Sequence, residues 1–226
     1  MMVSETTAAP TMRQTMEGKS KAHKVYLAVK RIFDFIAAAL GLIILSPLLL
    51  LIALLVKCED GGAIIHKRRC VADGGKHYYM YKFRSMVPDA DILENYLTPA
   101  QIEEYLKEVK LDDDPRITRI GKLIRKTSID ELLQLFNVVK GDMSLVGPRP
   151  LTEGELCHFG DRAGEILSVK PGITGYWQVN GRSDSTYESG KRQELELYYA
   201  QHQCLLLDVK ILFQTVLVVL RGVGAK

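Results

Sequence analysis

The sequence lacks the short motifs that mark most nucleotide-binding and hydrolytic sites. It contains no Walker or dinucleotide-binding glycine pattern, no G-x-S-x-G turn, no H-E-x-x-H helix and no internal repeat. Its four cysteines form no C-x-x-C pair and have no histidine at zinc spacing, which argues against a zinc site and for reduced thiols in a cytosolic domain. Its net charge of +3 is too small to indicate binding to nucleic acid.

The chain does contain a long apolar run, residues 36–56, which only Ser46-Pro47 interrupts. A straight helix of this length reaches about 30 Å, enough to cross the hydrocarbon core of a bilayer. Pro47 lacks a backbone N–H and clashes with the Ile43 carbonyl, so we expect a bend there. No small-residue cleavage site follows the run, which argues against a secretory signal. The run therefore crosses the membrane as a kinked helix, or enters one leaflet and returns.

Basic residues flank this run on both sides. They are Lys19, Lys21, Lys24, Lys30 and Arg31 before it, and Lys57, Lys67, Arg68 and Arg69 after it. Positive flanks favour the cytoplasmic side, where a spanning helix can place only one of them. A re-entrant hairpin that breaks at Ser46-Pro47 places both there, and the Ser46 hydroxyl can cover a carbonyl that the proline frees. We therefore favour the re-entrant helix, with the basic clusters meeting anionic headgroups or phosphorylated ligands.

Composition divides the chain into three parts. Residues 1–22 have no apolar period and are expected to be a disordered tail. Residues 23–58 form the predicted re-entrant helix, and residues 59–226 a domain at the cytosolic membrane face with interfacial helices. The predicted fold class is α+β, mainly helical, with a small antiparallel sheet.

Local patterns predict several elements of this domain. Residues 63–71 and 76–84 are expected to form a hairpin with a tight Asp-Gly turn. A turn at residues 171–175 is expected to lead into a strand through Val179. Residues 205–220 form an apolar helix that is too short to span a bilayer, so it is either buried or interfacial.

The sharpest group of chemically useful side chains lies in residues 125–131. As a structural pattern, Ser128-x-x-Glu131 is a capping box, and Asp130 in the first helical turn suits the helix dipole. Together with Arg119 and Arg125, the same helix N-terminus would form a phosphate site, and the adjacent carboxylates could hold a divalent cation. Neighbouring helix positions differ by about 100° in direction. One carboxylate can therefore attack while the other binds or orients a metal.

A second group lies in residues 141–150. Pro148 and Pro150 fix the backbone on both sides of Arg149, which pre-organises its guanidinium for a bidentate phosphate contact. An exposed turn with an incidental arginine explains the pattern equally well. Three further cations, Lys82, Arg84 and Arg182, could contact a ligand, although such residues are more often solvated charges. Trp177 could stack on a nucleobase, but core packing is the stronger interpretation.

These residues together resemble the bacterial sugar transferase family, which are monotopic polyprenyl-phosphate phosphoglycosyl transferases. The matching segments occur in the same order and are residues 30–34, 46–47, 81–86, 114–121, 127–132, 140–150, 170–175 and 178–182. Residues 69–76 depart from the family's usual Arg-x-Gly-x-x-Gly-Lys pattern. The insert at residues 98–113 resembles members that start capsule or O-antigen units with galactose or glucose phosphate.

The resemblance implies catalysis at the cytoplasmic face of the bacterial inner membrane, in contact with membrane lipids. In such enzymes the aspartate of an Asp-Glu dyad attacks the β-phosphorus of a UDP-sugar, releases UMP, and passes the sugar-phosphate to undecaprenyl phosphate. Carried over to this chain, Asp130 is the nucleophile, Glu131 is its partner near Mg²⁺, and Arg125 and Arg149 contact phosphate. A homodimer is compatible with the family.

Two other functions fit the same residues. The chain could be a membrane-bound glycosyltransferase that moves only the sugar and releases UDP. It could also be a membrane-anchored scaffold in which the dyad only caps a helix.

Overall fold

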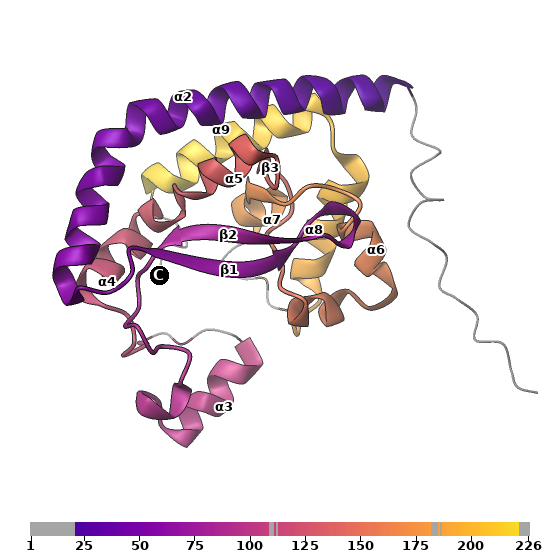
Figure 1. The fold of residues 1–226 in the computed structure, drawn as a ribbon. Coiled ribbons are helices and arrows are strands. Elements are labelled where there is room, and N and C mark those ends of the chain that lie inside the picture. Colours follow the sequence, from indigo (N-terminus) through magenta and orange to yellow (C-terminus); the bar gives the residue numbers. More distant parts are fainter. Residues whose placement is uncertain (1–20, 109–110, 112, 182–184, 186, 222–226) are drawn as a thin grey trace, which may run out of the picture.

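The computed structural model describes residues 21–108, 111, 113–181, 185 and 187–221. Its longest element is helix α2 (Lys21–Asp60), which runs along one side of the other elements and bends near its middle (Figure 1). The helix continues through Pro47, and the Ser46 hydroxyl donates a hydrogen bond of 2.8 Å to the Ile43 carbonyl that the proline leaves without its usual donor. The expected bend is therefore present. The expected break between two helices is not present, because the serine replaces the lost hydrogen bond and both halves form one bent helix. The tail predicted for residues 1–22 lies outside the described residues except for its last two, which begin α2.

Most apolar side chains of α2 face away from the domain. Ile44 and Leu50 are 73% and 72% exposed, and α2 is the one described helix that is long and apolar enough to cross a membrane. Helix α9 (Leu205–Arg221) lies beside the N-terminal half of α2, and its Leu206 and Phe213 are 80% and 67% exposed (Figure 1). Extended apolar surface of this kind marks a membrane or protein contact.

Polar side chains on the N-terminal half of α2 hold the helix against the domain. The Lys30 ammonium pairs with the Asp208 carboxylate of α9 at 2.9 Å. The Asp34 carboxylate accepts hydrogen bonds from the Ser144 hydroxyl at 2.7 Å and from the Leu145 N–H at 3.2 Å. Lys30 and Asp34 are both buried, so the polar positions in this half of the helix mark the side that faces the domain.

The predicted hairpin is confirmed. Strands β1 (Ile65–Val71) and β2 (His77–Phe83) pair in antiparallel fashion along their whole length. Their connection is a five-residue loop that contains the 3₁₀ turn η1 (Asp73–Gly75), one residue longer than the expected connection over residues 72–75. Gly74 and Gly75 have φ angles of 70° and 78°, a backbone region that favours glycine, so both glycines shape the wider loop.

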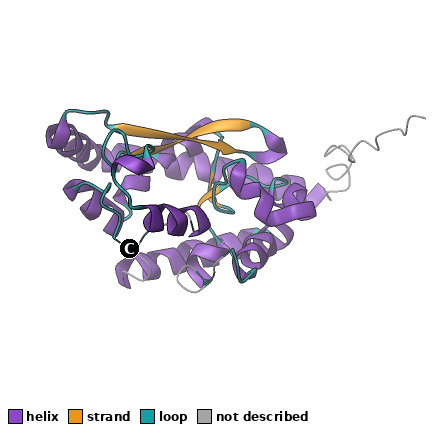
Figure 2. Ribbon diagram, turned by 90° about the horizontal axis from the view of Figure 1, so that it is seen from below, coloured by secondary structure: helices purple, strands orange, loops and turns teal. Residues whose placement is uncertain are grey.

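Short helices and a second small sheet make up the rest of the described chain. In order they are η2 (Leu93–Asn95), α3 (Pro99–Glu108), α4 (Arg119–Lys126), η3 (Ile129–Glu131), α5 (Gln134–Lys140), β3 (Ser144–Val146), η4 (Gly154–Arg162), α6 (Ala163–Ile166), β4 (Gly172–Thr174), α7 (Tyr176–Asn180), α8 (Lys191–His202) and α9. The α+β class with mostly helical content is as predicted (Figure 2).

The second sheet corrects two expectations. Strands β3 and β4 are parallel, so the sheet content is not all antiparallel. The predicted strand through Val179 is also wrong, because the strand occupies Gly172–Thr174 and helix α7 follows. Gly147 donates its N–H to the Thr174 carbonyl at 2.9 Å, and a Cβ on Gly172 would lie only 2.0 Å from the Gly147 nitrogen. The close approach of two backbones at glycines therefore places the strand where a turn was expected.

Helix α5 lies between α2 and the hairpin, and apolar contacts join the three. One buried cluster includes Ala38 of α2, Met80 of β2 and Val138 of α5. A second cluster includes Ile52 of α2 and Phe83 of β2. Helix α3 lies apart from this core (Figure 1). Both halves of the bent α2 thus pack against the domain that carries the hairpin.

The Asn137 side chain fastens α5 to strand β2. It is 0% exposed, its Oδ1 accepts a hydrogen bond from the Tyr81 N–H at 3.0 Å, and its Nδ2 donates to the Tyr79 carbonyl at 2.7 Å. The amide replaces the next strand of the sheet at this edge, because it satisfies both backbone groups that such a strand would bind.

Replacing Asn137 by leucine should lower the free energy of unfolding by about 2–4 kcal/mol, because the Tyr81 N–H and the Tyr79 C=O lose their partner. Thermal unfolding in detergent measures the change. Asn95→Ala, at an exposed asparagine in η2, is the control. Equal melting temperatures for Asn137→Leu and the wild type would show that the amide does not fasten these elements.

Candidate active site

The Asp130-Glu131 pair lies in the 3₁₀ turn η3, between α4 and α5. Ser128 has a φ of 56° and makes no side-chain capping bond, so the predicted capping box is wrong. An N-cap residue needs an extended backbone, which the left-handed conformation of Ser128 does not provide. Helix α5 begins only at Gln134. The two carboxylates therefore lie in a turn that precedes a helix, and neither caps it.

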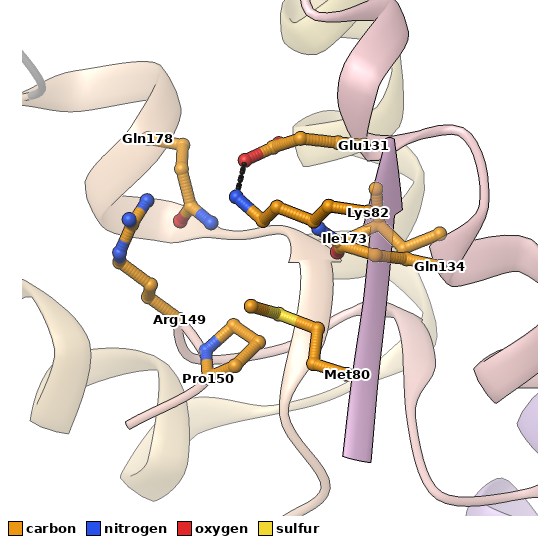
Figure 3. Close-up of a pocket in the computed structure, with 8 residues that line it drawn as sticks. All are labelled: Met80, Lys82, Glu131, Gln134, Arg149, Pro150, Ile173 and Gln178. Atoms are coloured by element: carbon orange, nitrogen blue, oxygen red, sulfur yellow. Dashed lines mark hydrogen bonds and ion pairs between the residues drawn. The ribbon is translucent and has the colours of Figure 1, made fainter. Parts of the chain in front are cut away.

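Glu131 is joined to the hairpin through Lys82. The Lys82 ammonium, on β2, lies 2.6 Å from Oε1 of Glu131 (Figure 3). Lys82 is also one of the residues that line the cavity described below, so its predicted ligand contact stays a prediction. Because β2 is fastened to α5, this ion pair also fixes the direction of the Glu131 side chain.

Asp130 is buried beside this pair. It is 8% exposed, and burial raises its pKa to about 6, an effect that Glu131 strengthens and that the positive charges of Lys82 and Arg125 oppose. A carboxylate that is kept desolvated among cations is typical of a catalytic position. Arg125, in the last turn of α4, is held by a hydrogen bond of 2.8 Å from its Nε to the Ser85 hydroxyl.

A small open cavity lies next to Glu131 of the dyad. Its walls are Met80, Lys82, Glu131, Gln134, Arg149, Pro150, Ile173 and Gln178 (Figure 3). Arg149 and Gln178 reach in from the side opposite the Lys82–Glu131 pair. The cavity thus has a carboxylate with its lysine on one wall and a guanidinium on the other, a charge pattern that suits a phosphate group next to a nucleophile.

Two of the predicted cations are placed elsewhere. Arg84 lies two residues after Lys82, which places its side chain about 6.6 Å farther along the extended chain. There it pairs with the Asp60 carboxylate at the end of α2. Arg119 is exposed at the first position of α4, and the dyad follows that helix's other end. No described contact links either residue to the cavity. Arg182 lies outside the described residues.

Sequence reasoning missed two polar residues of the cavity wall, Gln134 and Gln178. Gln134 is 2% exposed and lies three residues after Glu131, a spacing that could have drawn attention to it. Gln178 offered no such local signal. Trp177 is buried and lies under the guanidinium groups of Arg149 and Arg192, at 5.9 and 4.3 Å from the ring centroid, which favours its packing role over nucleobase stacking.

Comparison with known proteins identifies the family. A sequence model described as "Bacterial sugar transferase" matches residues 25–222. The chain belongs to the bacterial sugar transferase family.

Individual relatives of this family cover most of the chain. The exopolysaccharide production protein ExoY of Sinorhizobium fredii is 43% identical over 190 residues, 83% of each chain. An undecaprenyl-phosphate galactose phosphotransferase of Salmonella typhimurium is 46% identical over 200 residues, 87% of this chain and 41% of that protein. A UDP-galactose-lipid carrier transferase of Erwinia amylovora is 44% identical over 200 residues, with the same coverage of 87% and 41%. The chain thus spans less than half the length of the last two relatives.

The sugar transferase's dyad is suited to Mg²⁺, but only together with a ligand. Mg²⁺ usually takes one or two carboxylates from the protein and its other oxygens from substrate phosphates and water. Among the described residues no three His, Cys, Asp or Glu side chains form a metal-binding group. Asp130 and Glu131 would therefore hold the ion, with a phosphorylated substrate completing its coordination.

Asp130→Asn should stabilise the sugar transferase at neutral pH by about 1–3 kcal/mol. The folded-state pKa of about 6 lies above the ordinary value of 3.8, so between about pH 4 and pH 6 the folded protein keeps a proton that the unfolded chain loses. Wild-type stability therefore falls as the pH rises through this range, and the deficit persists above it. Asparagine removes the deficit.

Melting temperatures of both proteins at pH 7.5 and pH 4.5, with EDTA present, test this expectation. The gain should be large at pH 7.5 and small at pH 4.5. Asp161→Asn, at an exposed aspartate of η4, is the control and should give the same small change at both pH values. A gain that does not depend on pH would contradict the assigned cause.

Proposed function

We propose that this protein is a phosphoglycosyl transferase that moves a hexose-1-phosphate from a UDP-sugar to undecaprenyl phosphate, through a covalent aspartyl intermediate, and releases UMP. The observation that carries the proposal is the buried Asp130, whose neighbour in the chain, Glu131, lines a cavity with Arg149 on its opposite wall. Lys82 and Arg125 add positive charge at the nucleophile. The Asp-Glu dyad and the Pro-Arg-Pro turn also match the family segments in the sequence.

The reaction takes place in two displacements at one phosphorus. In the first, an oxygen of the Asp130 carboxylate attacks the β-phosphorus, the bond to the bridging oxygen breaks, and UMP leaves with that oxygen. In the second, a phosphate oxygen of the lipid attacks the same phosphorus and the Asp130 carboxylate is released. The products are UMP and a lipid diphosphate sugar, so every bond that forms replaces one that breaks.

The chain's own charges address the main difficulty of the first step. A carboxylate is a weak nucleophile, and an anionic phosphate repels it. Lys82 and Arg149, which line the cavity, and Arg125, whose charge acts on Asp130, offset this repulsion. Mg²⁺, when bound at Asp130 and Glu131, would neutralise further phosphate charge. The covalent relay lets one cavity accept a water-soluble donor first and a lipid acceptor afterwards.

The names of the relatives support the substrate class. The Salmonella and Erwinia relatives are named for galactose and for a lipid carrier, and the Sinorhizobium relative for exopolysaccharide production. We therefore propose a galactose- or glucose-type donor and a place at the first membrane step of exopolysaccharide, capsule or O-antigen assembly. A homodimer stays a prediction.

The two ends of α2 support a re-entrant position in the cytoplasmic membrane. Asp34, in the N-terminal half, binds Ser144, and Asp60, at the C-terminal end, binds Arg84 of the same domain. A helix that crossed a core about 30 Å thick would place its ends on opposite sides. Since one domain binds α2 on both sides of its bend, we propose that the exposed apolar bend dips into the cytoplasmic leaflet and that the domain lies at the cytoplasmic face.

The wild-type protein, incubated with UDP-galactose and Mg²⁺, should release UMP and gain the mass of one hexose phosphate. Asp130→Asn should do neither, because an amide cannot displace UMP. Intact-protein mass spectrometry and a UMP assay measure both results, with Asp161→Asn as the control. A panel of other UDP-sugars should be screened if galactose gives no signal.

Donor labelled in its β-phosphate separates the alternatives within the same experiment. Label in the lipid fraction supports phosphosugar transfer, and label in UDP supports a glycosyltransferase that moves only the sugar. Absence of turnover with every donor in the panel would favour a scaffold.

The membrane position can be tested by cysteine labelling. In a Cys157→Ser/Cys204→Ser background, exposed Cys58 near the end of α2 and a cysteine introduced as Lys24→Cys report on the two ends of the helix. An impermeant maleimide should leave both sites unlabelled in intact cells and label both in inverted membrane vesicles. Labelling of one end from outside intact cells would demonstrate a spanning helix.

A further inference from the structure

The turn that carries Arg149 has one backbone donor. Pro148 and Pro150 have no N–H, so only the Arg149 N–H can tie this turn to the rest of the protein by donating a backbone hydrogen bond. Its acceptor is Oε2 of Glu196, on helix α8, at 3.1 Å. The two residues are 47 positions apart in the sequence. A side chain from another helix therefore holds the centre of the Pro-Arg-Pro turn.

Burial of the Glu196 carboxylate costs free energy, so we expect this side chain to have a specific role. It is 1% exposed, and burial raises its pKa to about 7, although the Arg149 N–H and the charges of Arg192 and Arg149 oppose the rise. Its Oε1 has no hydrogen-bond partner within the described part of the chain. An apolar side chain would avoid the desolvation cost of a buried carboxylate. The hydrogen bond to the Arg149 turn is the contact that an apolar side chain could not make.

Helix α8 also supports the guanidinium of Arg149, through contacts of Arg192 with Trp177. Trp177 lies under that guanidinium, and Arg192, one helical turn before Glu196, lies over the rings of Trp177 and Tyr187 at 4.3 and 3.9 Å. Arg192 and Glu196 thus act on the same residue from one helix face, four positions apart. The backbone of Arg149 is held by Glu196, and its side chain rests on the tryptophan that Arg192 packs against.

We propose that Glu196 is a positioning residue for Arg149, and that its hydrogen bond to the Arg149 N–H sets the direction in which the guanidinium enters the cavity to bind the donor's diphosphate. This inference rests on the proposed function, because it takes a diphosphate as the ligand of Arg149. Glu196 itself is not among the cavity-lining residues, so it acts only through the turn.

Two conservative substitutions of Glu196 separate the effect of side-chain length from the effect of charge. Glu196→Gln keeps an acceptor oxygen at the same distance and removes the negative charge, whereas Glu196→Asp keeps the charge and withdraws the oxygen by one methylene. The probe is inorganic pyrophosphate, titrated calorimetrically into the full chain in detergent. We expect Glu196→Asp to weaken binding about tenfold and Glu196→Gln by less than about threefold, as the loss of one hydrogen bond predicts.

A double-mutant cycle with Arg149→Ala tests whether Glu196 acts through the arginine. Arg149→Ala weakens pyrophosphate binding, and adding Glu196→Asp to it should weaken binding no further, because the residue to be positioned is gone. Glu194→Gln, at an exposed glutamate of α8, is the matched control and should bind as the wild type does. A purely structural role would instead lower affinity equally in both backgrounds.

Several results would overturn the proposal. They are unchanged affinity in both Glu196 variants, a larger loss in Glu196→Gln than in Glu196→Asp, additive losses in the cycle, and no binding of pyrophosphate to the wild type. UMP release is measured separately on the same preparations. If the binding cycle behaves as expected while no UDP-sugar yields UMP, the proposed function fails and the positioning role of Glu196 stands.

Discussion

The geometry of the candidate site depends on how α5 is fastened to the hairpin. Asn137 bonds to the backbone of β2 at Tyr79 and Tyr81, and Lys82 is the next residue along that strand. The dyad turn η3 lies just before α5. The buried amide therefore fixes the distance between the lysine on one element and the carboxylates on the other. The 2.6 Å ion pair between Lys82 and Glu131 can form without ordering either backbone, because the amide has already done so.

The bent helix α2 is also attached to α5. Arg31 of α2 donates hydrogen bonds of 2.6 and 2.9 Å to the carbonyls of Val138 and Val139 near the end of α5. These carbonyls belong to the last turn of α5, where helix carbonyls lack an i+4 partner within the helix, and the Val138 carbonyl also accepts a hydrogen bond of 3.0 Å from the Gly141 N–H. A cation there also opposes the partial negative charge of the helix end. Helix α2 is thus joined to α5 by polar contacts at the helix end and by apolar contacts along its side, and α5 in turn holds the dyad.

Short sequence patterns predicted the parts of the fold that depend on interactions between residues close together in the sequence. The patterns of residues 63–71 and 76–84 gave the hairpin, and Pro47 gave the bend in α2. Each depends on residues within one or two turns of chain. Local patterns also marked Asp130 and Arg149 as candidates, and the resemblance to the family then gave them the roles of nucleophile and phosphate contact.

Contacts between segments that are far apart in the sequence could not be predicted from such short patterns. The left-handed Ser128 turned an expected cap into a 3₁₀ turn, because the chain must reverse between α4 and α5. The parallel pairing of β3 with β4 joins segments that carry no shared pattern in the sequence. Arg84 looked equivalent to Lys82 on the same strand face, yet its partner is Asp60 at the end of α2. A charge can be read from a sequence, but its partner depends on which distant element lies opposite.

Polar and apolar side chains lie on different sides of α2, so the medium that covers the helix affects the contacts that support the site. Lys30 and Asp34 face the domain, whereas Ile44 and Leu50 face outward, so the helix has a protein side and a side that water solvates poorly. If hydrocarbon covers the outward side, the polar contacts of the inward side are shielded from water and strengthen. The membrane would then stabilise the attachment of α2, α5 and the dyad turn as one unit. With the function proposed above, a lipid acceptor would reach the site from the same phase.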